Sequence, residues 1–272
     1  MRWPPSLVAG GTLFALIAAA AAAGPALAPY PHDEMNIMAR LVAPGAAHWL
    51  GTDEFGRDVL SRLLHGARLS LLMGIGATLV SLLLGVPLGL AAGYYRGRVD
   101  EAIMRSVDLL MSVPPILMGI LILSMTPPNP WKTAIAVGVI YVPIMARLAR
   151  SVTLEVAAEE FVLAARARGE RGWYILAAEI LPNAWPPIIV ESALRVTFAI
   201  MLGAALSFLG LGVHPPASDW GLMIAEARPF VGEAPWVAIA PGVVLCLTVI
   251  AVNLIGDGLR EVLDPRLKRG RG

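Results

Sequence analysis

The sequence has little charge and almost no cysteine. Only 15% of its 272 residues are charged, against roughly 25% in a typical soluble domain. In contrast, 57% are hydrophobic and the mean hydropathy is +0.70. Cys246 is the only cysteine, which excludes an intramolecular disulfide and a cysteine metal cluster. This composition is typical of a protein that crosses the membrane several times, and its length leaves room for roughly five to seven spans.

The sequence also lacks the motifs of nucleotide binding and catalysis. Neither Lys132 nor Lys268 follows a glycine, so there is no Gly-x-x-x-x-Gly-Lys-Ser/Thr loop to hold ATP phosphates. No Ser–His–Asp arrangement or carboxylate cluster indicates catalysis, and the histidines do not have the spacing of metal ligands. We therefore expect no catalytic or metal-binding residues, no cofactor bound by this chain and no nucleic-acid partner. Any ATP-derived energy must come from a separate subunit.

Six apolar stretches are long enough, or nearly so, to cross a bilayer. We place these spans at 6–28, 69–92, 103–125, 133–148, 188–209 and 238–255. The alternative for the first is a cleaved signal peptide, because Ala26-Leu27-Ala28 fits a small-residue cleavage site. Its apolar run is longer than the usual stretch of about 7 to 15 residues, which favours an uncleaved span.

Polar segments divide the chain into four parts. These are an N-terminal helix at 1–28, a segment at 29–67, a core with five further spans at 68–258, and a basic tail at 259–272. The core contains two long polar insertions, a hairpin at 151–183 and a loop at 210–235.

Segment 29–67 contains the pattern of a short amphipathic helix. Thr52 and Asp53 are residue types that cap helices, and apolar side chains recur at helical spacing beyond them. The apolar residues are Phe55, Val59, Leu60, Leu63 and Leu64. We predict a helix on the membrane surface here, and Trp220 and Trp236 of the second loop as anchors at the membrane interface.

The basic residues indicate how the chain is oriented. If the N-terminus is inside, fifteen of the 21 Lys and Arg residues fall on the inner ends and loops. Cytoplasmic loops carry an excess of Lys and Arg. Both termini and hairpin 151–183 are therefore predicted to be cytoplasmic, whereas 29–67 and 210–235 face outside.

The most polar part of the hairpin, 159–183, is predicted to form two short helices. The first runs over 159–168 and ends at Gly169, and the second runs from Trp173 to Ile180 and stops before Pro182. Phe161, Ala164, Ala165 and Arg168 form a stripe on the first helix. This stripe fits a docking surface for a partner protein; the alternative is a hairpin resting on lipid headgroups.

The hairpin resembles the EAA loop of ABC importer permeases, through Ala164-Ala165, Gly169 and Leu181-Pro182. In that family the loop forms coupling helices that sit in a groove of the cytoplasmic ATPase. The residues around this motif are similar to those of the dipeptide/oligopeptide/nickel branch of the family. The motif glutamate would fall at Leu163, and Glu179 stands where that branch often has histidine.

Three other stretches resemble the same branch. They are Leu50-Gly51-Thr52-Asp53-Glu54-Phe55-Gly56-Arg57-Asp58 with Ser61-Arg62, Leu206-Ser207-Phe208-Leu209-Gly210-Leu211-Gly212 with Pro215-Pro216 and Trp220-Gly221, and Asn253-Leu254-Ile255-Gly256-Asp257-Gly258-Leu259-Arg260 with Leu263-Asp264-Pro265. With the hairpin they cover most of the chain from Trp49 onward.

The resemblance implies the C-type transmembrane subunit of a type I ABC importer, an all-α permease with six transmembrane helices and a coupling hairpin between the fourth and fifth. It implies inward transport of di- or oligopeptides, nickel or a related small solute. The expected partners are a second permease subunit, two cytoplasmic ATPases that bind ATP and Mg, an external substrate-binding protein and the lipid of the cell inner membrane. The residues expected to couple to the ATPase are Glu160, Phe161, Ala164, Ala165, Arg166, Gly169, Leu181 and Pro182.

Glu191 and Arg195 lie one helical turn apart inside the fifth predicted span. Charges there usually face the bundle interior or a watery path, so the pair is a candidate for the path or its gate. The alternative is a structural ion pair near the inner interface. Two other functions remain open at this point. A stand-alone secondary transporter or channel would need no nucleotide, and a membrane scaffold would transport nothing.

Overall fold

The computed structural model describes residues 3–125 and 129–263. Arg2, Asp264-Pro265 and the basic tail from 264 onward therefore lie outside the described residues. The described part of the chain is built from helices. They are α1 (Pro5–Leu27), η1 (Ile37–Ala39), α2 (Val59–Tyr95), α3 (Gly97–Met111), α4 (Pro115–Ser124), α5 (Pro130–Val156), α6 (Glu160–Ala167), α7 (Gly172–Tyr174), η2 (Ile175–Ile180), α8 (Leu181–Phe208), α9 (Trp220–Ala227), η3 (Arg228–Phe230) and α10 (Pro235–Leu263).

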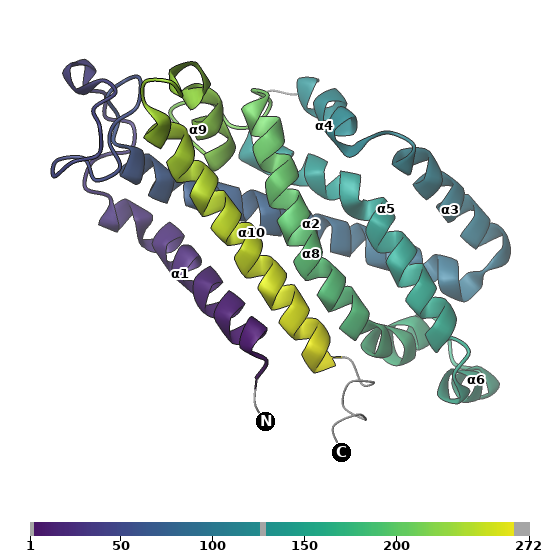
Figure 1. The fold of residues 1–272 in the computed structure, drawn as a ribbon. Helices are drawn as coiled ribbons and strands as arrows, with labels where there is room; N and C mark the ends of the chain where they lie inside the picture. The colour runs from purple at the N-terminus through teal and green to yellow at the C-terminus, as the bar shows by residue number, and fades with distance from the viewer. Residues whose placement is uncertain (1–2, 126–128, 264–272) are drawn as a thin grey trace.

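The long helices form one inclined bundle with different structures at its two ends (Figure 1). Helix α1 packs against α10, α10 against α8, and α2 crosses the bundle and packs along α5. We call the end that carries α6 and α7 the hairpin end; α1 begins and α10 ends there. The opposite end, which carries segment 28–58 and α9, is called the loop end.

Glycines let α2 and α5 approach closely. A Cβ atom added at Gly85 would lie 2.6 Å from the Cβ of Met145, and one at Gly89 would lie 2.6 Å from the Cβ of Ala149. Both contacts are shorter than real side chains allow. Small residues at such crossings let two backbones pack tightly, which is the main source of helix association inside a membrane.

Within residues 3–125 and 129–263, five helices are long and apolar enough to span a membrane by themselves: α1, α2, α5, the continuous helix 172–208, and α10. The third predicted span, 103–125, is not a straight helix. It is divided into α3 and α4, which meet at 86°, so a sixth span exists only if this bent pair is counted as one. Pro114 and Pro115 lie at the break, where two missing backbone donors prevent the helix from continuing.

The predicted surface helix near Glu54 is wrong. Residues 53–58 form a turn, and α2 begins at Val59 and continues without a break for 37 residues through the second predicted span. The helix cap is Asp58, whose Oδ2 accepts hydrogen bonds of 2.8 Å from both the backbone N–H and the Oγ–H of Ser61. The helix continues through Pro87 and is much longer than the apolar stretch alone indicated.

Because α2 and α5 pack so closely, adding one methyl group to α2 at their contact should lower the stability of the fold. Gly89→Ala places a Cβ against the α5 backbone and should destabilise the fold by about 1–3 kcal/mol. The matched control is Gly242→Ala in α10, where an added Cβ meets nothing within 4 Å. Thermal unfolding of the purified protein in detergent should separate the two variants. Equal unfolding temperatures would contradict the close α2–α5 contact.

Candidate functional site

The first hairpin helix has nearly the predicted bounds. Helix α6 runs over Glu160–Ala167, and Gly169 follows with φ +79°. This left-handed conformation is unfavourable for residues with a side chain and is typical of the glycine that ends a helix. The Gly169 N–H donates to the Arg166 carbonyl at 3.0 Å. The prediction of a helix ended by Gly169 is therefore confirmed.

The two sides of α6 face different surroundings. Val162 and Ala165 are fully buried against the rest of this chain. Phe161 is 39% exposed, and Glu160, Ala164 and Arg166 are also exposed. The predicted stripe is thus divided, because Phe161 and Ala164 point outward whereas Ala165 supports the helix from below.

The hairpin shares its core with the membrane helices. Val162 and Ala165 belong to one buried cluster with Ile175 and Ile180, and this cluster extends to Val86 and Leu90 of α2 and to Ala149 of α5. The Arg166 guanidinium carbon also lies 4.6 Å from the centre of the Tyr94 ring at the end of α2. Helix α6 is therefore packed onto the ends of α2 and α5.

The second part of the hairpin does not stop before Pro182, as was predicted. Helix α7 continues through η2, a π-helical segment, directly into α8. The Leu181 N–H donates to the carbonyl of Leu176, five residues earlier. Pro182 follows this π-helical turn closely and lies inside the continuous helix 172–208. Leu181 is half-buried and Pro182 is exposed.

Glu191 and Arg195 form an ion pair in the middle of α8. Arg195 Nη2 lies 2.8 Å from Glu191 Oε1, and the guanidinium carbon lies 4.7 Å from the centre of the Phe198 ring. The Nε atom of Arg195 is buried and has no hydrogen-bond partner within the described ranges. The side chains are 12% and 21% exposed for Arg195 and Glu191 respectively.

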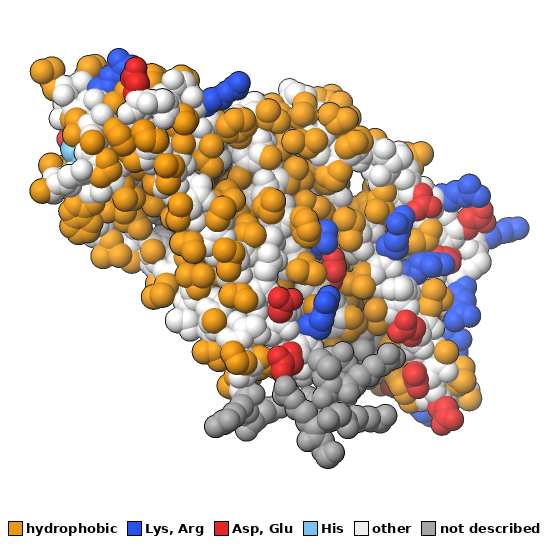
Figure 2. Space-filling model, viewed as in Figure 1, with side chains coloured by type: hydrophobic (Ala, Val, Ile, Leu, Met, Phe, Trp, Pro, Cys, Tyr) orange, Lys and Arg blue, Asp and Glu red, His pale blue; other side chains and the backbone are white. Residues whose placement is uncertain are grey.

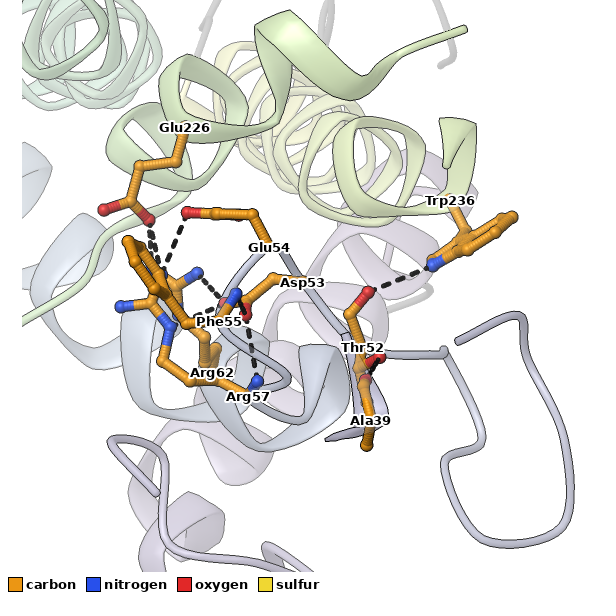
Figure 3. A network of polar contacts seen from close by, with 9 residues as sticks. All are labelled: Ala39, Thr52, Asp53, Glu54, Phe55, Arg57, Arg62, Glu226 and Trp236. Carbon is orange, nitrogen blue, oxygen red and sulfur yellow. Dashed lines mark hydrogen bonds and ion pairs between the residues drawn. The ribbon is translucent and has the colours of Figure 1, made fainter. Parts of the chain in front are cut away.

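A second group of charges lies at the loop end and joins three elements (Figure 3). Asp53 is fully buried and lies 2.6 Å from both Arg57 Nε and Arg62 Nη1. Glu226 of α9 accepts from Arg62 Nη2 at 2.6 Å and from Arg57 Nη2 at 3.1 Å. Glu54 accepts from Arg57 Nη2 at 3.3 Å. These five residues are called the loop-end ion cluster.

Aromatic contacts also hold segment 36–58 to the loop end. Trp236 Nε1 donates to the Thr52 carbonyl at 3.4 Å (Figure 3), and Arg40 lies over the Phe230 ring at 5.5 Å. Trp220 is fully buried, and its Nε1–H donates to the Leu63 carbonyl at 3.2 Å. The prediction of Trp220 as a membrane-interface anchor is therefore wrong, because its ring belongs to the core between α2 and α9.

Sequence reasoning found the residues of this cluster only in part. The stretch from Asp53 to Arg62 carries a family resemblance, but its local pattern does not predict that its charges pair in a buried cluster. No local pattern singles out Glu226. Its partners lie 164 and 169 positions earlier in the chain, and no local spacing in the sequence points to them.

Comparisons with known proteins show relatives along nearly the whole chain. Residues 85–269 match the family described as "binding-protein-dependent transport system inner membrane component". The dipeptide transport system permease protein of Alkalihalophilus pseudofirmus is 43% identical over 94% of this chain and 84% of its own length. The glutathione transport system permease protein of Pectobacterium atrosepticum is 42% identical over 96% of this chain and 87% of its own. The di/tripeptide permease protein of Pseudomonas aeruginosa is 41% identical over 95% and 88%.

A solved structure of the methionine ABC transporter in an inward-facing conformation has a similar fold. The TM-score is 0.64 with 18% sequence identity, and the match covers 75% of this chain and 96% of that chain. The predicted fold, that of a type I ABC importer permease, is therefore confirmed.

The loop-end ion cluster predicts that Asp53 is required for stability. Asp53→Asn removes the shared partner of two buried guanidinium groups and should destabilise the fold by about 3–5 kcal/mol. Asp33→Asn is the control, because Asp33 is 54% exposed in the same segment. Thermal unfolding should show a large shift for the first variant and almost none for the second. Similar shifts would mean that the buried ion pairs do not hold this end together.

Proposed function

Because the chain belongs to the family of binding-protein-dependent transport system inner membrane components and is the permease subunit of an ABC importer, we propose that it forms half of a translocation path for short peptides. The observation that carries this proposal is the likeness to permeases of dipeptides, di/tripeptides and glutathione along nearly all of the chain. All three solutes contain peptide bonds. Because the chain belongs to this family, we no longer consider a stand-alone transporter, a channel or a scaffold as its function.

The proposed assembly contains a second permease subunit, two cytoplasmic ATPases and an external substrate-binding protein, in the cell inner membrane. ATP and Mg²⁺ belong to the ATPases, and this chain binds no cofactor in the proposal. The hairpin end would then face the cytoplasm and the loop end the outside. Lys and Arg support this orientation, because more of them are visible on the side of the hairpin end than at the loop end (Figure 2).

In the proposed mechanism, the ATPase contacts the exposed side of α6 and displaces this helix when it moves. Phe161 and Ala164 supply an aromatic anchor and room for close approach, with Glu160, Arg166, Gly169, Leu181 and Pro182 around them. Ala165 acts from the buried side by fixing α6 to the bundle. Since 172–208 is one continuous helix, displacement of the hairpin also displaces α8. The two permeases then alternate between inward-facing and outward-facing states.

Glu191 and Arg195 are proposed to border the path. A charged pair in the middle of a long apolar helix is unfavourable against lipid, so it needs water or protein beside it. The Nε–H of Arg195 is buried without an acceptor in the described chain, so it becomes available to a solute or to water only when the surrounding helices move.

The two sides of α6 allow a sharp test of coupling. Ala164→Arg changes only the exposed side, so the chain should fold normally while ATPase co-purification and uptake fall by about tenfold or more. Ala165→Arg forces a charge into the hairpin core and should lower the amount of folded protein instead. Ala102→Arg on the exposed surface of α3 is the control. Normal assembly and uptake in the Ala164 variant would remove this surface from the mechanism.

Uptake measurements test the solute and the path together. A strain lacking this gene should lose uptake of labelled di- or tripeptides and regain it when the gene is restored. Unchanged peptide uptake, with loss of nickel uptake, would assign a different solute. In the same assay, the double variant Glu191→Gln/Arg195→Gln should reduce uptake per folded transporter, because the path loses both charges. A loss of folded protein with normal uptake per molecule would make the pair purely structural.

A further inference from the structure

The loop-end ion cluster contains more negative than positive groups. Asp53, Glu54 and Glu226 are at most 16% exposed, and in residues 3–125 and 129–263 the cations paired with them are Arg57 and Arg62. If all five groups were ionised, the cluster would carry one excess negative charge. An uncompensated buried charge is costly, and such a group usually becomes neutral.

Glu54 is the carboxylate with the poorest pairing. Asp53 and Glu226 each accept from both arginines at distances between 2.6 and 3.1 Å. The side-chain donor to Glu54 Oε1 is Arg57 Nη2, at 3.3 Å, and this nitrogen is shared with Glu226. Glu54 Oε2 is buried and has no partner in the described part of the chain, and the side chain is only 10% exposed. The excess charge therefore falls on Glu54.

Other charged groups nearby do not balance it. Asp58 faces Ser61 and His48, with its Oδ1 2.9 Å from His48 Nδ1. Asp219 accepts from Ser207 Oγ at 2.7 Å, and Arg40 lies over the Phe230 ring. Neither aspartate supplies a positive charge to the cluster, and burial raises the pKa of Asp219.

We propose that Glu54 binds a proton in this conformation, and that this proton completes a clamp between segment 36–58 and α9. With Glu54 neutral, two carboxylates face two guanidinium groups, and Glu226 of α9 remains tied to Arg57 and Arg62. In Figure 3 the carboxyl groups of Glu54 and Glu226 approach the arginines together, so an ionised Glu54 would repel the group that holds α9.

The pKa of Glu54 agrees with this arrangement. Burial is the main cause that raises the pKa above its ordinary value of 4.5; Asp53 and Glu226 raise it further, while a backbone hydrogen bond and Arg57 oppose the rise. A carboxyl group with a raised pKa contributes stability that is fully present below its unfolded value and lost as pH rises through the folded value. The clamp should therefore weaken with increasing pH.

The proton site does not depend on the proposed function, but its consequence for transport does. Helix α9 packs between α8 and α10 at the loop end. If that end faces outside, the external pH controls the strength of the contact between α9 and segment 36–58 while the path opens.

Hydrogen exchange of the complete transporter in lipid nanodiscs tests the proposal. Amides in 36–58 and in α9 should lose protection as pH rises, after correction for the intrinsic effect of pH on exchange. In the Glu54→Gln variant, which imitates the protonated group, the amides of 36–58 and α9 should stay protected at high pH. Their exchange should be about tenfold slower than in the native chain for each unit by which the pKa of Glu54 is raised. Glu54→Asp should retain the pH dependence, and Glu34→Gln, an exposed control in the same segment, should match the native chain.

Two results would overturn the proton site. The first is a Glu54→Gln variant with the same pH dependence as the native chain. The second is protection that follows the Na⁺ concentration at constant pH, which would show that a metal cation balances the charge. Neither result depends on which solute is transported, so failure of the proton site is distinguishable from failure of the peptide assignment.

Discussion

The hydrocarbon interior of the membrane cannot hydrogen-bond to this chain, and most of its architecture follows from that constraint. Polar groups are concentrated at the two ends of the bundle, while the helices between them are apolar and pack through small residues such as Gly85 and Gly89. Two arginines in the long helices are paired with carboxylates. Arg62 in the first turns of α2 contacts Asp53 and Glu226, and Arg195 in α8 contacts Glu191.

The two polar ends are mechanically connected through these helices. At the hairpin end, Val162 and Ala165 share a core with α2 and α5, and the chain continues without a break into α8. At the loop end, α2 begins inside the ion cluster, and α9 follows shortly after α8. The buried side of the hairpin is thus part of the bundle, whereas Phe161 and Ala164 on its other side are exposed.

Local sequence patterns predicted those helices and helix ends that are determined by residues close together in the sequence. Apolar runs located the long helices, and Gly169 marked the end of α6. The patterns failed where distant residues decide the structure. Arg62 lies in a predicted surface helix by spacing, yet Asp53 and the distant Glu226 make its burial possible. Pro182 indicated a helix end, but the π-helical turn before it lets the helix continue. The apolar stretch 103–125 was predicted as one span, whereas the chain bends by 86° between α3 and α4, which both pack onto α5.

The central claim is that the hairpin and α8 move as one body. The distance between spin labels at Ala167 on α6 and Leu209 after α8, both exposed, tests it most directly in the complete transporter, with the single native Cys246 replaced by serine. Double electron–electron resonance should give the same distance distribution without nucleotide and in the ATP-bound state. A shift of the distribution on ATP binding, beyond the width caused by label rotamers, would show that the hairpin swings independently and would contradict the account.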